Sequence, residues 1–231
     1  MPRRLRFIGS YIAKVEAKPK SAFGELVIPG SYSGSTRGSG PRNLGSNPSP
    51  GAIERRKMDG QRQILMVIAQ NDFRDEEYEI PKTIFEEAGF LVKTASERRG
   101  EAMGKLGTKV QVDLPLMEID IDDFEALIFV GGPGAADYFH DGEVLNLVRD
   151  FSKKGKVTAA ICIAPSILAN AGILEGQRAT AFPSEQENLT SRGAEYSGAP
   201  VESSGNIITA NGPQAAKEFA QAIIKALSSR G

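Results

Sequence analysis

The sequence is poor in the residues that form disulfides, zinc sites and catalytic dyads. It holds one cysteine, one histidine and no tryptophan among 231 residues. A single cysteine excludes an intrachain disulfide, and one cysteine with one histidine cannot build a structural zinc site. We therefore expect no metal site, and we expect a reducing cytoplasm as the compartment.

Long hydrophobic runs are also missing. The sequence has no run of about 18 apolar residues, so we expect no membrane-spanning helix. Its content of 40% hydrophobic and 25% charged residues is ordinary for a globular protein. No pattern of basic and aromatic residues occurs in the part expected to fold, so we expect no nucleic acid to bind there.

Positive charge is concentrated at the start of the chain. Residues 1–58 hold eleven Lys or Arg and three Glu, whereas the remaining residues hold 17 Lys or Arg and 26 Asp or Glu. Gly, Ser and Pro fill more than half of residues 21–51, and such a segment cannot bury enough apolar surface to fold. We expect residues 1–57 to be a disordered basic extension and residues 58–231 to form one domain.

The purpose of this basic extension stays open. A transit peptide, a nucleic-acid-binding arm and a tail without function all fit its composition. Met58 stands directly before the first sequence that is typical of a folded domain. We therefore hypothesise that Met58 is a usable translation start and that the residues before it are dispensable.

Strand and helix patterns alternate through the rest of the chain. Apolar runs predict strands at 64–69, 91–95, 109–113, 126–130 and 157–161, near Ala179, and in a hairpin near Val201 and Ile207. Helical spacing predicts helices over 78–88, 143–154, 165–172, 185–191 and 213–227. The polar, Gly-rich stretch 97–108 is expected to be a connection. This alternation indicates a three-layer, flavodoxin-like α/β fold with a mostly parallel sheet.

The single cysteine lies where a strand gives way to a helix. Val157–Ile161 has the pattern of a buried strand, Cys162 follows directly, and Pro165 occupies the first turn of a helix that ends at Gly172. This is a nucleophile elbow with cysteine in place of serine. Taken alone, a cysteine in an apolar run is more often an inert core residue. Here the helix dipole would favour the thiolate at the carboxyl end of the sheet, so we expect Cys162 to be reactive.

A partner for the cysteine is harder to choose. The one histidine, His140, follows a different strand, and we interpret it as a surface residue. A carboxylate is the next candidate, and five acids crowd the connection after the first strand: Asp72, Asp75, Glu76, Glu77 and Glu79. Their chemistry does not choose among them, because acids at a helix start also simply complement its dipole.

A glycine loop follows another predicted strand. Gly131-Gly-Pro-Gly134 lacks the Gly-x-Gly-x-x-Gly spacing, because Asp137 stands where the third glycine is needed. We therefore do not interpret it as a dinucleotide site. Glycines do let backbone N–H groups approach a reacting oxygen, as an oxyanion hole requires.

Four motifs, in order, resemble the ThiJ/PfpI superfamily, which includes the Parkinsonism-associated deglycase and archaeal intracellular proteases. They are the cysteine elbow Ala159–Pro165, the Glu-x-x-x-Pro element Glu77–Pro81, the Gly-Gly loop Val130–Gly134 and the C-terminal segment Ile208–Pro213. The resemblance extends over about residues 62–229. It implies a class I glutamine amidotransferase-like fold.

The resemblance also implies roles for particular residues. Cys162 would be the nucleophile, Glu77 the acid hydrogen-bonded to its sulfur, and the amides of Gly132 and Ile163 the oxyanion hole. To donate that hydrogen bond, Glu77 must hold a proton near neutral pH, so burial must raise its pKa. Family members are commonly homodimers, some of which assemble further, so we expect a homodimer or a higher homo-oligomer.

Two departures from the family pattern bear on activity. Ile163 stands where the protease-like branch has a histidine, and Phe182 stands where some relatives keep a site histidine. Both count against amide hydrolysis, which needs a general acid for the leaving amine. We expect action on α-oxoaldehydes or glycated adducts, in the manner of a glutathione-independent glyoxalase or deglycase, without a cofactor and in stress protection. The alternatives are a non-catalytic redox-sensing or chaperone-like stress protein and an intracellular cysteine peptidase.

Overall fold

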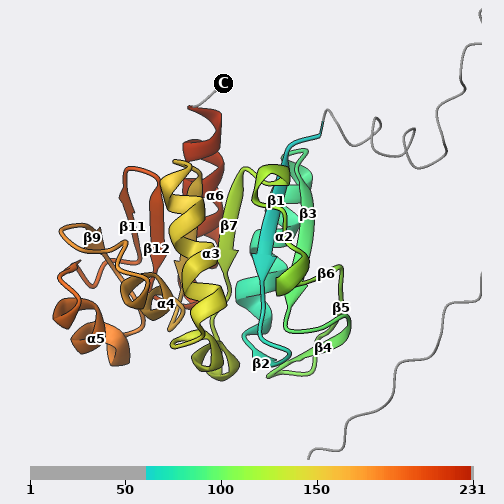
Figure 1. Cartoon of the computed structure of the whole chain (residues 1–231), viewed down its shortest axis with the longest axis horizontal. Coiled ribbons are helices and arrows are strands. Elements are labelled where there is room, and N and C mark those ends of the chain that lie inside the picture. Colours follow the sequence, from blue (N-terminus) through green and yellow to red (C-terminus); the bar gives the residue numbers. More distant parts are fainter. Residues whose placement is uncertain (1–60, 230–231) are drawn as a thin grey trace, which may run out of the picture. The chain divides into compact units, whose positions relative to one another are not determined.

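The computed structural model describes residues 61–229, so the predicted disordered extension over residues 1–57 and the hypothesis about Met58 lie outside the described part. Within that part, a seven-stranded sheet carries helices on both faces (Figure 1). The predicted three-layer α/β architecture is therefore confirmed.

The central sheet is parallel apart from one edge. Its order is β11-β12-β8-β7-β1-β3-β6, and only the β11–β12 pair is antiparallel. The strands are β1 (Gln63–Val67), β3 (Leu91–Ser96), β6 (Leu114–Pro115), β7 (Ala126–Phe129), β8 (Val157–Ile161), β11 (Val201–Ser204) and β12 (Ile207–Ala210). The strands predicted for this sheet are confirmed, with ends that differ by one or two residues.

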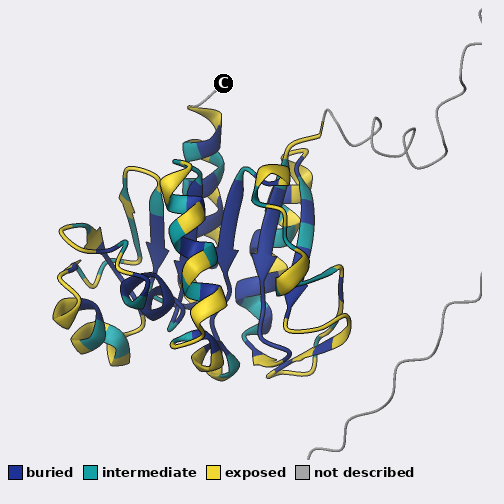
Figure 2. Cartoon of the chain, in the orientation of Figure 1, coloured by how far each residue is buried: buried dark blue, intermediate teal, exposed yellow. Residues whose placement is uncertain are grey.

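Two hydrophobic cores flank this sheet. Along β1, Ile64 and Met66 face one core, and Leu65 and Val67 face the other. The first core is closed by α2 (Asp75–Glu87) and α6 (Ala216–Ser228), the second by α3 (Gly142–Lys153) and α4 (Pro165–Asn170). Figure 2 shows buried strands between helices whose outer faces are exposed. A strand covered on both faces needs apolar side chains in succession, which is why these strands are continuous apolar runs.

Shorter elements complete the connections. They are α5 (Gln186–Ser191), the paired strands β9 (Arg178–Ala179) and β10 (Glu195–Tyr196), and the 3₁₀ turns η1 (Leu116–Glu118), η2 (Ile121–Asp123), η3 (Pro133–Tyr138), η4 (Pro183–Glu185) and η5 (Pro213–Ala215). No helix within residues 61–229 is long and apolar enough to cross a membrane.

The stretch predicted as a polar connection contains a strand. β4 (Gly100–Gly104) pairs antiparallel with β5 (Lys109–Val112) and parallel with β2 (Asn71–Phe73), which forms a separate three-stranded sheet. In β4 only Ala102 and Gly104 are buried. A hairpin that buries so little has no strong apolar pattern, so the prediction of a plain connection was wrong.

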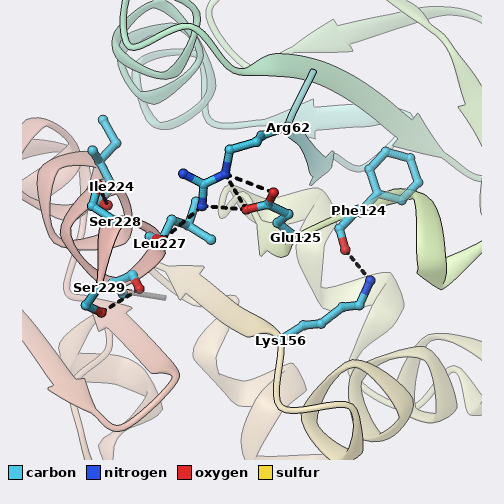
Figure 3. A network of polar contacts seen from close by, with 9 residues as sticks. Arg62, Phe124, Glu125, Lys156, Ile224, Leu227, Ser228 and Ser229 are labelled. Carbon is cyan, nitrogen blue, oxygen red and sulfur yellow. Dashed lines mark hydrogen bonds and ion pairs between the residues drawn. The ribbon is translucent and has the colours of Figure 1, made fainter. Parts of the chain in front are cut away.

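A polar network ties the amino ends of the strands together (Figure 3). Arg62, directly before β1, donates to the carboxylate of Glu125, directly before β7, and its Nη2 donates to the carbonyl of Leu227 at 2.9 Å. Lys156, directly before β8, donates to the carbonyls of Ile121 and Phe124. These contacts hold α6 and three strands at the end of the sheet opposite to Cys162, so they serve the fold.

Candidate active site

Cys162 occupies a sharp turn between β8 and α4. Its φ angle is +64°, in the left-handed region that costs a non-glycine residue about 1 kcal/mol. The backbone is fixed on both sides, because the Cys162 amide donates to the Ala210 carbonyl at 2.9 Å and its carbonyl accepts from the Phe182 amide at 2.7 Å. The predicted passage from strand to cysteine to helix is therefore present.

Glu77 is fully buried in the first turn of α2. Its Oε2 accepts a hydrogen bond from the Gly131 amide at 3.1 Å. Its other oxygen, Oε1, is buried and has no hydrogen-bond partner among residues 61–229. A Cβ added at Gly131 would lie 2.5 Å from both Oε2 of Glu77 and Cβ of Cys162, so these two atoms are at most about 5 Å apart. Glu77 and Cys162 therefore lie close together beside Gly131.

The other four acids of this connection have different surroundings. Asp75 accepts from the amides of Leu106 and Thr108, Glu76 pairs with Arg74, Glu79 accepts from the Thr108 hydroxyl, and Asp72 is exposed. Glu77 is the acid of the five that lies beside the cysteine.

Burial is the largest influence on the pKa values of Glu77 and Cys162. It raises the pKa of Glu77 to about 7, against lowering effects from Cys162 and the Gly131 amide. Burial, followed by the negative charge of Glu77, raises the pKa of Cys162, while the Gly132 and Ile163 amides lower it. The short helix after Cys162 therefore does not by itself favour the thiolate as the sequence suggested. The carboxylate next to the sulfur opposes it.

The two groups titrate as one unit. Two arrangements of the pair contain the same number of protons. In one, Glu77 is a carboxylate and Cys162 a thiol; in the other, Glu77 is a carboxylic acid and Cys162 a thiolate. Moving the proton from Cys162 to Glu77 removes the repulsion that the carboxylate exerts on the sulfur, and it supplies an acid that can donate a hydrogen bond to the thiolate. Thiolate formation in this site therefore requires that Glu77 takes up the proton.

Gly132 and Ile163 line the same cavity as Cys162, and their amides lower the pKa of its thiol. Gly132 has a φ of +98°, and a Cβ there would lie 2.4 Å from the Arg74 backbone nitrogen and 2.5 Å from the Asp72 carbonyl oxygen. Only glycine fits this position. The structure thus brings Cys162, Glu77, Gly132 and Ile163 together.

These four residues line one cavity of about 420 Å³. The apolar wall comes from Phe182 and two prolines, Pro133 and Pro213. The remaining lining residues were not singled out from the sequence; they are Arg74, Lys105, Ser184 and Gln214. They come from separate loops at one end of the sheet, and no local motif connects them.

His140 is exposed and does not line this cavity, as its interpretation as a surface residue requires. A larger groove of about 730 Å³ runs between α2, β3 and β5. It contains neither the cysteine nor the buried acid, so the smaller cavity is the candidate active site. Within residues 61–229, no three His, Cys, Asp or Glu side chains are grouped so that they could hold a metal ion.

The sequence pattern of the DJ-1/PfpI family matches residues 62–226. The chain belongs to the DJ-1/PfpI family. The predicted resemblance to ThiJ/PfpI proteins is thereby confirmed, and the match includes every residue that lines the cavity.

Individual relatives agree with this assignment. An uncharacterised protein of Methanocaldococcus jannaschii is 40% identical over 177 residues, which is 75% of this chain and 86% of that protein. A deglycase of Pyrococcus horikoshii is 31% identical over 149 residues, 64% of this chain and 90% of that protein. The crystal structure of a ThiJ/PfpI domain protein from Brachyspira murdochii superposes with a TM-score of 0.72 at 38% identity, covering 74% of this chain and 99% of that one.

Proposed function

We propose that this protein is a cysteine-dependent enzyme that acts on α-oxoaldehydes or their early adducts, in the manner of a glutathione-independent glyoxalase or deglycase. The observation that carries the proposal is that Cys162 and the buried acid Glu77 both line one cavity and approach the same point beside Gly131, each 2.5 Å from a Cβ built there. The pair combines a nucleophile with one group that can both give and take a proton.

The first step is addition. The Cys162 thiolate attacks the aldehyde carbon of methylglyoxal, and the carbonyl oxygen becomes an oxyanion near the Gly132 and Ile163 amides. Glu77, protonated in this tautomer, gives its proton to that oxygen. The product is a hemithioacetal on Cys162, and Glu77 is left as a carboxylate.

The second step moves two protons within the substrate. The Glu77 carboxylate removes the hydrogen from the carbon bonded to sulfur, which gives an enediolate, and the hydroxyl proton on that carbon passes to the neighbouring oxygen. Glu77 then returns its proton to the neighbouring carbon, so the hemithioacetal becomes a lactoyl thioester. One water then hydrolyses the thioester, releasing lactate and restoring the thiol. No oxidant, reductant or cofactor enters this sequence.

The deglycase reaction uses the same two groups. The thiolate displaces the amine or thiol of an early glycation adduct, and Glu77 protonates the leaving group. The Pyrococcus horikoshii relative carries the name deglycase, which supports this branch of the proposal. Peptide hydrolysis receives less support, because Ile163 and Phe182 occupy the positions at which relatives place a histidine.

An assay of lactate formation from methylglyoxal tests the proposal. Wild-type protein should form lactate, and Cys162→Ser should reduce the rate by at least about a thousandfold, because a serine hydroxyl is not ionised at neutral pH. Turnover that survives in Cys162→Ser would refute the mechanism. Casein hydrolysis by the wild type that disappears in Cys162→Ala would favour the peptidase instead.

A second function, oxidation sensing, is supported by one observation. Cys162 is the single cysteine of the chain, so its sulfenic acid cannot be resolved by an intrachain disulfide, and a second equivalent of peroxide can oxidise it to sulfinic acid. The Gly132 and Ile163 amides could donate hydrogen bonds to the sulfinate oxygens. Mass spectrometry after mild peroxide tests this reading, which fails if Cys162 remains a thiol.

The proposal includes a cellular location and an oligomeric state. A cytoplasmic location would keep the single thiol reduced. We also propose a homodimer, since the exposed Ile80 on α2 leaves apolar surface uncovered. Light scattering in solution tests the dimer, and a purely monomeric protein would contradict it.

A further inference from the structure

Lys105 is one of the residues that line the cavity. It is exposed and stands in the turn between β4 and β5. Among residues 61–229, no carboxylate lies within ion-pair distance of its ammonium group. Lys109, in the same hairpin, differs in both respects: it pairs with Glu101 at 3.0 Å and does not line the cavity.

The turn that carries Lys105 is fixed to the start of α2. The buried carboxylate of Asp75 accepts from the Leu106 amide at 2.8 Å and from the Thr108 amide at 2.9 Å. The Lys105 amide itself donates to the Phe73 carbonyl at 2.9 Å. A buried carboxylate satisfied by two amides makes a rigid attachment, so the base of the Lys105 side chain is held in place beside the active site.

At Gly104, the β4–β5 hairpin closely approaches the start of α2. A Cβ at this position would lie 2.3 Å from Oδ1 of Asp75. The hairpin can therefore reach the acid only with glycine there. Asp75, one of the five acids that residue chemistry left open, fixes the hairpin that carries Lys105 and does not line the cavity.

A second cation lies in the same cavity wall. The Arg74 guanidinium uses Nε and Nη2 to bind the Glu76 carboxylate at 2.8 and 3.1 Å. A guanidinium has five N–H donors, so others remain for a ligand. The one carboxyl group in the cavity lining is Glu77, which is fully buried. The exposed charges of the lining are thus positive.

We propose that the cavity selects carbonyl substrates that carry an anionic group, a carboxylate or a phosphate, and that Lys105 is the residue that binds this group. The inference rests on the proposed function only for the reaction at the carbonyl. A volume of about 420 Å³ suits a small metabolite with its carbonyl at Cys162 and its anionic end at the mouth.

Alkylation of Cys162 tests the charge preference without requiring turnover. Iodoacetate is anionic and iodoacetamide is neutral, and the two reagents have nearly the same size. Because Cys162 is the single cysteine, the rate of alkylation measured by intact mass reports on this site alone. The ratio of the iodoacetate rate to the iodoacetamide rate measures the preference for an anion and cancels differences in thiol reactivity.

The variant Lys105→Met should lower this ratio by about tenfold, and added salt should lower the wild-type ratio toward that of the variant. Lys105→Arg should keep the ratio within about twofold of wild type. Lys109→Met is the matched control and should leave the ratio unchanged. Equal ratios in wild type and Lys105→Met would overturn the proposal, as would a Cys162 that neither reagent alkylates in the folded protein.

Turnover distinguishes the two kinds of anion. For 4,5-dioxopentanoate, an α-oxoaldehyde with a carboxylate, KM should be about tenfold lower than for its methyl ester, and Lys105→Met should remove the difference. The same comparison of KM between hydroxypyruvaldehyde phosphate and a neutral analogue tests the preference for a phosphate. Equal KM values for each anion and its neutral analogue would contradict the proposal. A Lys105-dependent alkylation ratio without any turnover would sustain anion selection and reject the α-oxoaldehyde reaction.

Discussion

The Gly131 amide donates a hydrogen bond of 3.1 Å to Oε2 of Glu77, although the two residues lie 54 positions apart in the sequence. This bond orients the acid that stands beside Cys162. It also leaves Oε1 as a buried oxygen without a partner among the described residues. In the proposed mechanism, this is the oxygen that exchanges the proton with sulfur and substrate.

Replacing Glu77 with glutamine should reduce kcat for methylglyoxal by about a hundredfold or more, because an amide cannot transfer the proton between the two carbons. Glutamine keeps the size of the side chain and can still accept from Gly131. Glu79→Gln, on the exposed face of the same helix, is the control and should retain wild-type kcat. An active Glu77→Gln enzyme would remove the acid from the mechanism.

The pH dependence of stability should reveal the buried acid. Burial raises the pKa of Glu77 from 4.5 to about 7, so between these values the folded protein binds more protons than the unfolded chain. The free energy of unfolding is therefore highest below about pH 4.5, as far as this group is concerned, and falls as the pH rises through 7. The loss approaches about 3 kcal/mol.

Urea unfolding at a series of pH values measures this effect. Wild type and Glu79→Gln should lose stability together between pH 5 and pH 8, relative to Glu77→Gln, which lacks the titrating group. The same pH dependence in all three proteins would show that Glu77 ionises as easily in the folded state as in the unfolded chain.

Gly131→Ala should separate the acid from the thiol. The added Cβ would lie 2.5 Å from both groups and 2.8 Å from the Ile161 carbonyl oxygen, so at least one of them must move. We expect a loss of about 1–3 kcal/mol in stability together with most of the activity. Gly142→Ala is the matched control, since nothing lies within 4 Å of its added Cβ. Full activity in Gly131→Ala would mean that the pair does not need its present spacing.

The domain boundary also leads to an experiment. Both hydrophobic cores described above are built within residues 61–229, so we expect residues 58–231 to fold without the basic extension. Circular dichroism and thermal unfolding should give the same cooperative transition for this shorter chain as for the full chain. A shorter chain that aggregates or loses its dimer would assign the extension a structural role.

The sheet and the elbow were predictable because their patterns are local. A strand buried on both faces is a continuous apolar run, and the turn at Cys162 is marked by the proline of the following helix. The positions of β1, β7 and β8 therefore followed from the sequence. So did the conclusion that Cys162 stands at the carboxyl end of the sheet.

The choice of Glu77 and the role of Lys105 depend on contacts between distant segments. Asp75 and Glu77 are both buried in the first turn of one helix, and only the neighbouring loops decide which of them meets the sulfur. The family resemblance chose Glu77, whereas the residue chemistry alone left five acids open. Lys105 was missed because an exposed hairpin has little apolar pattern, although the glycines at 104 and 107 flank its turn.

The coupling between Glu77 and the Cys162 thiol is central to the proposed mechanism, and the pH profile of Cys162 alkylation by iodoacetamide measures it directly. In wild type, reactivity should rise near pH 7, as the pair loses its first proton and Glu77 holds the remaining one for the thiolate. In Glu77→Gln the thiol must release its proton to solvent from a buried site, so the rise should move to higher pH. Identical profiles for the two proteins would contradict the account.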